Sequence, residues 1–386
     1  MKIIYLDNNA TTMVAPEVLD EMMPYFCERY ANPSSMHTFG GQIAHAIKKA
    51  RRQVANLLGC DPSEVFFTGC GTESDNWAIN GVLAAAPHRR KIITTRVEHP
   101  AVLTTARELA NRGYTVIELA VDGEGRLDPA DLEKEIDDNT ALVTIMYANN
   151  ETGVIFPVEK LAAMAKARGV PFHTDAVQAV GKVPIRLMDG SIDLLSISGH
   201  KLHAPKGVGV LYVRKGTRIM PCMTGGHQEG GRRAGTENVP SIIGLGKACE
   251  MAAEFLVDEN TRVRKLRDRL EKTLLKRCPD CRVNGGQVDR LPNTTNISFE
   301  FIEGEAILLL MDRSGVCASS GSACTSGSLE PSHVLRAMGV PFTAAHGSIR
   351  FSLSRYNTEE EIDFVADKMP EVITRLRELS PFVARK

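Results

Sequence analysis

The stretch IDLLSISGHK, residues 192–201, is an apolar run that ends in a lysine, and it decides how the rest of the chain is interpreted. Its apolar residues predict a short buried strand. Because desolvating an ammonium is costly, burial at the end of such a strand lowers the pKa of a lysine. The neutral amine that this favours is the form that a Schiff base to an aldehyde requires. Ser198 and His200 beside Lys201 offer donors suited to a phosphate. Taken alone, Ser-x-x-Lys is more often a surface lysine at a strand end.

An acid lies upstream, at the end of a second apolar strand. Residues 171–174 predict that strand, and Asp175 and Gln178 follow it. A lysine that can form a Schiff base, together with a carboxylate that holds a pyridinium nitrogen, is the arrangement that pyridoxal phosphate requires. The combination of Lys201 with Asp175 therefore favours a pyridoxal-phosphate site over an incidental surface lysine.

Strand-like and helix-like segments alternate along the first two thirds of the chain. This alternation predicts an α/β fold, with a mostly parallel sheet and helices on both faces. The expected strands cover residues 64–68, 91–97, 115–119, 141–147, 171–174, 192–197 and 208–213, and the expected helices cover 16–30, 40–58, 73–86, 101–112 and 158–168.

The character of the sequence changes after about residue 258. A long helix that reaches residue 277, strands at 294–299 and 348–353, and a final helix with a capping box at Thr358 and Glu361 predict a smaller α+β domain. We expect a large cofactor-binding domain over residues 15–258, and a small domain made of residues 1–14 and 259–386.

Polar residues stand directly after five of the predicted strands. In an open parallel α/β sheet, ligands bind outside the carboxyl ends of the strands. Small residues and a hydroxyl at the start of a helix also suit a phosphate. Each group has an ordinary structural explanation, but five together favour one ligand site. The groups are Gly71 with Thr72, Glu98 with His99, Asn149 to Glu151, Asp175 with Gln178, and Ser198 to Lys201.

The composition indicates a globular protein with a large core. The chain has 386 residues, of which 43% are hydrophobic, and its net charge is −1 from 46 basic and 47 acidic residues. Without a long run of either charge, neither nucleic acid nor a membrane surface is an expected partner. No window is apolar enough for a transmembrane helix, and Asp7 comes too early for a signal peptide, so we expect a cytoplasmic protein.

The nine cysteines are scattered and odd in number, which is not typical of a disulfide framework. Cys278 and Cys281 form the single C-x-x-C pair. With no second pair, we interpret them as a pair of loop cysteines rather than as a zinc or redox site.

The motifs together resemble the NifS/IscS-type cysteine desulfurases, most closely the nitrogen-fixation branch. These are pyridoxal-phosphate enzymes of the aspartate-aminotransferase fold, fold type I. The resemblance extends from about residue 3 to about residue 365. One departure is Gly71, where many relatives have alanine; we expect little effect, because the backbone N–H makes the contact. The motifs are residues 5–12 (YLDNNATT), 71–76 (GTESDN), 98–99, 149–153 (NNETG), Asp175 with Gln178, 198–201, 232–236 (RRAGT) and 319–324 (SSGSAC).

The resemblance implies a role for each matching residue. Lys201 would bind the cofactor covalently, Asp175 would pair with its ring nitrogen, and His99 would stack on the ring and serve in proton transfer. Gln178 and Asn150 would lie near the ring hydroxyl, and Arg350 with Asn150 would bind the substrate carboxylate. The residues that would hold the phosphate are Gly71, Thr72, Ser198 and His200, with Thr236 reaching the phosphate in the other subunit of a homodimer.

A second functional stretch, residues 318–328, contains small residues and Cys324. Such a composition favours a mobile loop, and five extended residues span about 16 Å, enough to carry a thiol from the cofactor to a partner. By resemblance, free L-cysteine would yield L-alanine and a Cys324 persulfide. The resemblance further implies that the sulfur would pass to an iron–sulfur scaffold protein for nitrogenase maturation, and that Cys324 could briefly ligate an iron of the growing cluster.

Other functions remain open at this point. Within enzymes, the alternatives are a selenocysteine lyase and another pyridoxal-phosphate lyase or aminotransferase, although an aminotransferase has no need for Cys324. From a different class, the chain could be a non-catalytic sulfur carrier that kept the fold. The presence of Lys201, Asp175 and His99 argues against that alternative.

Overall fold

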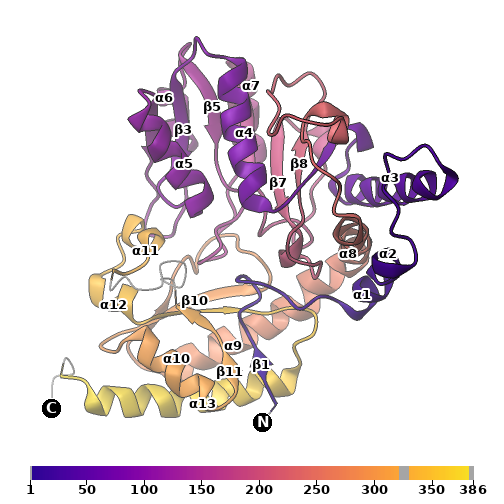
Figure 1. Cartoon of the computed structure of the whole chain (residues 1–386). Helices are drawn as coiled ribbons and strands as arrows, with labels where there is room; N and C mark the ends of the chain where they lie inside the picture. Colours follow the sequence, from indigo (N-terminus) through magenta and orange to yellow (C-terminus); the bar gives the residue numbers. More distant parts are fainter. Residues whose placement is uncertain (1, 321–329, 382–386) are drawn as a thin grey trace.

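A seven-stranded sheet forms the larger body of the structure, a computed structural model that describes residues 2–320 and 330–381 (Figure 1). Its strand pairs are parallel except for those of β8, which runs antiparallel to both β2 and β7. The prediction of a mostly parallel sheet is confirmed. In sheet order the strands are β2 (Val65–Thr68), β8 (Gly209–Val213), β7 (Leu194–Ser198), β6 (Phe172–Asp175), β5 (Thr140–Thr144), β3 (Lys91–Thr95) and β4 (Thr115–Leu119).

Both faces of this sheet are apolar, because successive residues of a strand point to opposite sides. In β7, for example, Leu194 packs against one core cluster and Leu195 against the other. Since β8 reverses direction, β2 runs the same way as β7, and the predicted strand ends meet at one edge. One face is covered by α4 (Gly71–Ala85) and α5 (Pro100–Asn111), the other by α3 (Thr38–Leu58), α6 (Pro129–Glu135), α7 (Val158–Ala167) and α8 (Val239–Asp258) with α1 (Pro16–Met22).

A smaller body is built on an antiparallel sheet, in the order β12-β13-β10-β9, with its own hydrophobic core. The N-terminal strand β1 (Ile4–Tyr5) belongs to this body, because it pairs in parallel with β11 (Val316–Cys317). The other elements are β9 (Cys281–Val283), β10 (Thr294–Phe299), β12 (Ser319–Ser320), β13 (Ser348–Ser352), α9 (Arg264–Arg277), α10 (Gly304–Asp312), α11 (His333–Ala337), α12 (Phe342–His346) and α13 (Glu359–Leu379).

Several element boundaries differ from the prediction for identifiable reasons. The strand expected over residues 91–97 ends at Thr95, whose hydroxyl bonds the Glu98 carboxylate at 2.7 Å and turns the chain. The helix expected over 16–30 is split into α1 and α2 (Pro24–Cys27). Helices α6, α8, α10, α11 and α12 and the short strands β1, β9, β11 and β12 were not predicted. Short 3₁₀ turns cover Pro62–Glu64, Leu187–Asp189, Gly199–Lys201 and Gln228–Gly231.

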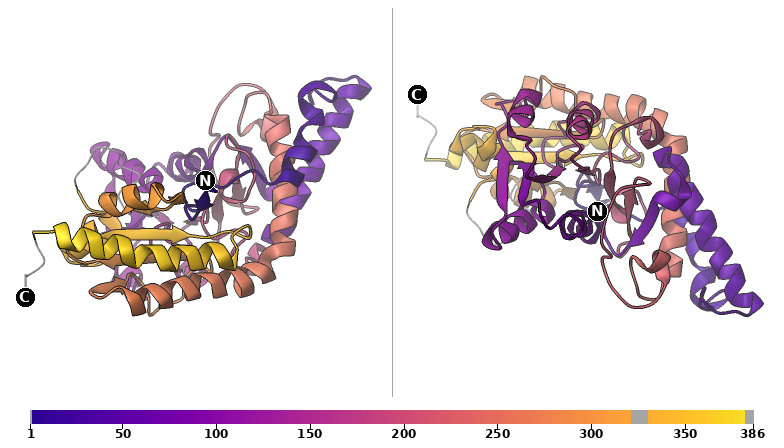
Figure 2. Two further views of the ribbon diagram at one scale, coloured as in Figure 1. Left: turned by 90° about the horizontal axis from the view of Figure 1, so that it is seen from below. Right: turned by 90° about the horizontal axis from the view of Figure 1, so that it is seen from above.

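The two bodies are joined by one long helix. A π-helical turn over Glu259–Val263 continues α8 into α9, so the chain has no break near residue 258 (Figure 2). We propose that the chain nevertheless forms the expected domains, 15–258 and 1–14 with 259–386, because the smaller body has a core cluster of its own; Val334 of α11 and Ala344 of α12, however, pack into the core of the larger body. Among the described residues, no helix combines the length and apolarity that crossing a bilayer demands.

Candidate active site

A cavity of about 320 Å³ lies where the carboxyl ends of β2, β3, β5, β6 and β7 meet. The N-terminal segment and β13 of the smaller body close it from the other side. The prediction that these strand ends surround one site agrees with this arrangement. The predicted residues that line the cavity are Gly71, Thr72, His99, Asn150, Asp175, Gln178, Ser198, His200, Lys201 and Arg350.

Lys201 reaches the cavity from a 3₁₀ turn, Gly199–Lys201, that directly follows β7. Its side chain is half-buried, and its Nζ donates hydrogen bonds to the main-chain carbonyls of Asn9 and Ala10, the latter at 2.7 Å. The amine is therefore held by two neutral acceptors from the N-terminal segment. An amine in this position can bind an aldehyde in the cavity or take up a proton there.

Asp175 ends β6 and is 7% exposed. Its Oδ1 accepts the N–H of Val177 at 2.9 Å. Burial raises the pKa of Asp175, whereas the nearby His99 and Lys201 lower it. A cationic ring nitrogen beside this carboxylate would add to that lowering and be stabilised in turn.

The buried carboxyls of Asp75 and Glu98 lie near Asp175, and no role was predicted for either from the sequence. Burial raises the pKa of Asp75 well above its usual range, and the charge of Asp175 adds to the effect. Burial also raises the pKa of Glu98 to about 8, although the Met146 N–H and the Thr95 hydroxyl bond its Oε1. Like charges this close favour one ionised carboxylate and protonated neighbours.

His99 is the N-cap of α5, where its Nδ1 accepts the N–H of Ala101 at 3.1 Å. That bond leaves the proton of a neutral ring on Nε2. Burial lowers the pKa of His99, and the charge of Lys201 lowers it further, while Asp175 opposes both. A neutral imidazole at this place can stack on a flat ring and pass a proton.

The proposed phosphate corner lies at the N-terminus of α4, which begins at Gly71. A Cβ at Gly71 would meet Val177 Cγ2 at 2.9 Å and Ser198 Cβ at 3.1 Å. This argues against the expectation that alanine would matter little there, because Val177 would have to shift to admit a methyl group. His200 joins the corner, and its Nδ1 lies 3.1 Å from the Thr11 hydroxyl. Burial, with the charges of Lys201 and Lys206, lowers the pKa of His200 to about 4.

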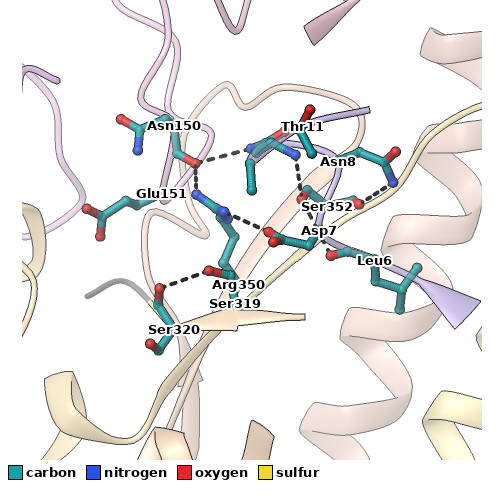
Figure 3. A network of polar contacts seen from close by, with 12 residues as sticks. Leu6, Asp7, Asn8, Thr11, Asn150, Glu151, Ser319, Ser320, Arg350 and Ser352 are labelled. Atoms are coloured by element: carbon teal, nitrogen blue, oxygen red, sulfur yellow. Dashed lines mark hydrogen bonds and ion pairs between the residues drawn. The ribbon is translucent and has the colours of Figure 1, made fainter. Parts of the chain in front are cut away.

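Arg350 extends from β13 into the cavity and is 5% exposed (Figure 3). Its Nη2 pairs with Asp7 Oδ1 at 2.8 Å, and its Nη1 donates to the main-chain carbonyl of Asn150 at 3.0 Å. Its Nε finds no partner among the described residues. Asp7 therefore fixes the orientation of the guanidinium. This role was not predicted, although Asp7 belongs to the motif at residues 5–12.

Gln178 is buried, and its Nε2 donates to the Asn9 carbonyl at 2.9 Å. Lys182, four residues further along in the same turn segment, donates to the main-chain carbonyl of Gln178 at 3.1 Å. Burial lowers the pKa of Lys182 to about 8. Neither Asn9 nor Lys182 was predicted; a signal for Asn9 existed in its motif, whereas nothing in the sequence marks Lys182.

One predicted residue in the described part of the chain does not line the cavity. Thr236 is exposed on the loop before α8, and Cys324 lies outside the described residues. Cys70, which precedes α4, does line the cavity and is thus a second thiol to consider. Burial raises the pKa of Cys60 and of Cys249 to about 12, which makes both poor nucleophiles.

Comparison with known proteins defines the class. The family model described as Aminotransferase class-V matches residues 4–365. The chain belongs to this family. A solved structure titled NIFS-LIKE PROTEIN superposes with a TM-score of 0.91 at 42% identity, and the match covers 97% of this chain and 100% of that one. The predicted fold class is confirmed.

Curated relatives narrow the class to the cysteine desulfurases, to which this chain belongs. A cysteine desulfurase of Trichormus azollae is 62% identical over 99% of this chain and 96% of the relative. Cysteine desulfurase NifS of Azotobacter vinelandii is 59% identical over 98% and 94%. A structure titled SspA in complex with cysteine matches with a TM-score of 0.81 at 36% identity, covering 92% and 99%. The predicted family and enzyme class are confirmed.

The cavity has the groups that pyridoxal phosphate needs. Its lining includes the Lys201 amine, the buried Asp175 carboxylate, which could pair with a ring nitrogen, and the N-terminus of α4, whose N–H groups suit a phosphate. These groups come from separate strands and converge on one space. The residues present therefore fit the cofactor on which this family depends.

Proposed function

We propose that this chain uses pyridoxal 5′-phosphate to take sulfur from L-cysteine, giving L-alanine and a persulfide on Cys324. The observation that carries the proposal is the single cavity in which Lys201, Asp175 and Arg350 meet. An amine, an anion and a guanidinium in one space match the aldehyde and ring nitrogen of the cofactor and the carboxylate of the substrate.

The cofactor would be held at four points: by a covalent bond, at its ring nitrogen, at its ring hydroxyl and at its phosphate. Lys201 would bind it covalently, Asp175 would keep a proton on the ring nitrogen, and the Gln178 amide would face the ring hydroxyl, with Asn150 near it. Bound in this way, pyridoxal phosphate supplies an electron sink that makes the Cα proton of the substrate acidic. The residues proposed to hold the phosphate are Gly71, Thr72, Ser198 and His200, together with Thr236 of a second subunit.

The chain's own residues would bind the substrate and move its protons. Arg350, already oriented by Asp7 and by the Asn150 carbonyl, would bind the substrate carboxylate. When the amine of the substrate takes the place of Lys201 on the cofactor, the Lys201 amine would be free to accept the Cα proton. The Asn9 and Ala10 carbonyls can stabilise the resulting ammonium. His99 would hold a proton at Nε2 for the later steps.

Sulfur transfer would belong to Cys324. Its thiolate would attack the sulfur of the bound cysteine, so that an S–S bond forms as the Cβ–S bond breaks. The electron pair of the broken bond stays with the carbon fragment, which gains a proton at Cβ and leaves as alanine. The sulfur on Cys324 is then available to an acceptor.

We further propose a homodimer. The α1–α3 arm extends from the rest of the molecule and exposes large apolar side chains at Met23, Phe26, Tyr30 and Met36 (Figure 2). Burying such an arm against a second copy would cover them and could bring Thr236 to the other cofactor site. Sedimentation of the full chain measures the oligomeric state, and a monomer at micromolar concentration would contradict this proposal.

The sulfur acceptor is proposed to be an iron–sulfur scaffold protein, with Cys324 briefly able to ligate an iron. The relative named NifS supports a link to nitrogenase maturation. We also propose a cytoplasmic location, because scattered cysteines suit a reducing compartment. Cluster assembly on a purified scaffold, with iron and cysteine supplied, tests the acceptor, and fractionation of cells tests the location.

The deciding experiment measures alanine and sulfide formed from L-cysteine by wild type, Cys324→Ala and Cys70→Ala. Cys324→Ala should still change the cofactor absorbance on adding cysteine, but should release no alanine. Cys70→Ala should keep turnover. Sulfide at full rate from Cys324→Ala would favour a lyase that expels sulfur without a protein nucleophile. L-selenocysteine as the better substrate would favour a selenocysteine lyase, production of a keto acid would indicate an aminotransferase, and no turnover at all would indicate a sulfur carrier.

A further inference from the structure

Asn9 lies in the N-terminal segment, is 1% exposed, and ties that segment to the smaller body. Its backbone N–H donates to the Ser352 hydroxyl at 2.9 Å, and its Nδ2 donates to the Thr294 hydroxyl at 2.9 Å. Its Oδ1 accepts from Asn293 Nδ2 at 3.1 Å. Thr294 and Asn293 therefore fix the orientation of the side chain, and Ser352 fixes the main chain at residue 9.

The second proton of the same Nδ2 points to the cavity wall. Nδ2 also donates to the main-chain carbonyl of Asn150 at 3.2 Å, and that carbonyl accepts Arg350 Nη1 at 3.0 Å. Asn9 and Arg350 thus share one acceptor. Because a carbonyl oxygen has two lone pairs, both bonds can exist together, and each donor constrains where the other can lie.

The main-chain carbonyl of Asn9 faces the opposite wall. It accepts Gln178 Nε2 at 2.9 Å and also the Lys201 Nζ. One buried residue is consequently bonded to the amine proposed to carry the cofactor and to the loop that orients the guanidinium. No polar group of Asn9 is left over for a merely local role.

We propose that Asn9 is a positioning residue that sets the substrate-binding guanidinium of Arg350 relative to Lys201. The inference rests on the proposed function, in which Arg350 binds the substrate carboxylate. Loss of the Asn9 amide would free the Asn150 carbonyl to move, and Arg350 would then bind a carboxylate less well. The main chain at residue 9 would also lose the side-chain bonds that hold its carbonyl beside Lys201.

Asn8 provides a matched control. It is also an asparagine, is 4% exposed, and bonds the carbonyls of Ser352 at 2.9 Å and Tyr5 at 3.3 Å. It does not line the cavity. A purely structural effect of removing a buried amide should therefore appear in Asn8→Ala as well as in Asn9→Ala.

The test uses the holoenzyme and measures the Kd for L-alanine, from the change in cofactor absorbance, and the KM for L-cysteine. In Asn9→Ala both should rise about fivefold or more, the loss expected for one buried hydrogen bond. Asn9→Ser, too short to reach both the Asn150 and Thr294 oxygens, should shift them in the same direction. Asn8→Ala should leave both constants within about twofold of wild type, whatever its melting temperature.

A double-mutant cycle separates this inference from the proposed function. Arg350→Gln should weaken alanine binding strongly, and Asn9→Ala should add little in that background, because both changes act through one group. If Asn9→Ala and Asn9→Ser leave the Kd unchanged while Arg350→Gln raises it, the role of Asn9 is wrong and the carboxylate site stands. If Arg350→Gln itself leaves the Kd unchanged, the proposed carboxylate site fails.

Discussion

Lys201 combines two tasks, covalent attachment and proton uptake, in one amine. Lys201→Ala should lower kcat at least about 10³-fold, because both the covalent bond and the nearest base are lost. The cofactor should still co-purify, held by Asp175 and the N-terminus of α4. Alanine formation and cofactor absorbance measure the two effects, with the exposed Lys215→Ala as a control. Turnover near the wild-type rate would refute the assignment.

Glu151 makes folding stability depend on pH. It is 4% exposed and accepts a hydrogen bond from the Ser332 hydroxyl, which joins the Asn150 loop to α11. Burial raises its pKa from 4.5 to about 7, although Ser332 and Arg350 oppose the shift. The folded chain therefore binds the proton more tightly than the unfolded chain, so this group costs stability as the pH rises from about 4.5 to about 7.

Glu151→Gln should remove that cost. At pH 8 the variant should be more stable than wild type by about 3 kcal/mol, and the difference should vanish toward pH 4.5. Urea unfolding at several pH values measures it, with the exposed Glu133→Gln as a control. A difference that is independent of pH would show that folding does not raise the pKa of Glu151.

Single residues could be predicted where the chemistry follows a strand. Lys201, Asp175 and His99 each come just after an apolar run, and the ends of parallel strands meet at one edge. Asp75 and Lys182 sit inside helical or turn sequence, where an acid or a lysine is ordinarily a solvated residue. Their burial arises from packing between distant segments, which one sequence does not reveal.

At the scale of elements, the start of α4 makes the sharpest prediction. Gly71→Ala should speed loss of the cofactor several-fold, because the new methyl group would meet Val177 and Ser198, and the stiff valine cannot easily turn away. Gly41→Ala, in α3, is the control: nothing lies within 4 Å of its Cβ position, and alanine favours a helix by about 1 kcal/mol. Equal cofactor retention in both variants would contradict a tight cradle.

Most elements with strong apolar runs could be predicted, although α8 is strongly apolar and was not. The sheet strands have apolar residues on both faces, so their runs stand out. Helix α6 is short and mostly polar, and β9 is a three-residue edge strand, so neither has a clear period. Some strands end earlier than predicted because a side-chain hydrogen bond turns the chain before the apolar run is over. The bond from the Thr95 hydroxyl to Glu98 ends the β-sheet pairing of β3 in this way.

At the scale of the whole molecule, Thr236 tests whether two chains share each site. Lys201→Ala and Thr236→Glu homodimers should both be nearly inactive, the second because a carboxylate would repel the phosphate. In a mixed dimer one site has Lys201 and Thr236 both intact, so each mixed dimer should have about half the activity of a wild-type dimer. Alanine formation by mixed dimers purified after co-expression measures this, and no recovery would place Thr236 in its own subunit's site.

The fold class could be predicted from alternation and motifs, whereas the join between the two bodies could not. The change of composition near residue 258 suggested a boundary, yet α8 and α9 are continuous through Glu259–Val263. A π-helical turn keeps helical hydrogen bonding while adding a residue, so no Gly or Pro marks it. The sequence signal of a domain boundary therefore fell within a helix.

That π-helical turn also sets the rotation of α9 about the common helix axis relative to α8. Deleting one residue from it would restore α-helical pairing without breaking the rod, yet would turn everything beyond it by about 100° and draw it back by about 1.5 Å. Arg262 in this turn holds the carbonyls of Arg355 and Asn357, close in sequence to β13. The number of residues in this turn, more than their side chains, therefore sets how the smaller body is rotated relative to the larger one. That rotation in turn sets the direction in which the Arg350 guanidinium faces the Lys201 amine.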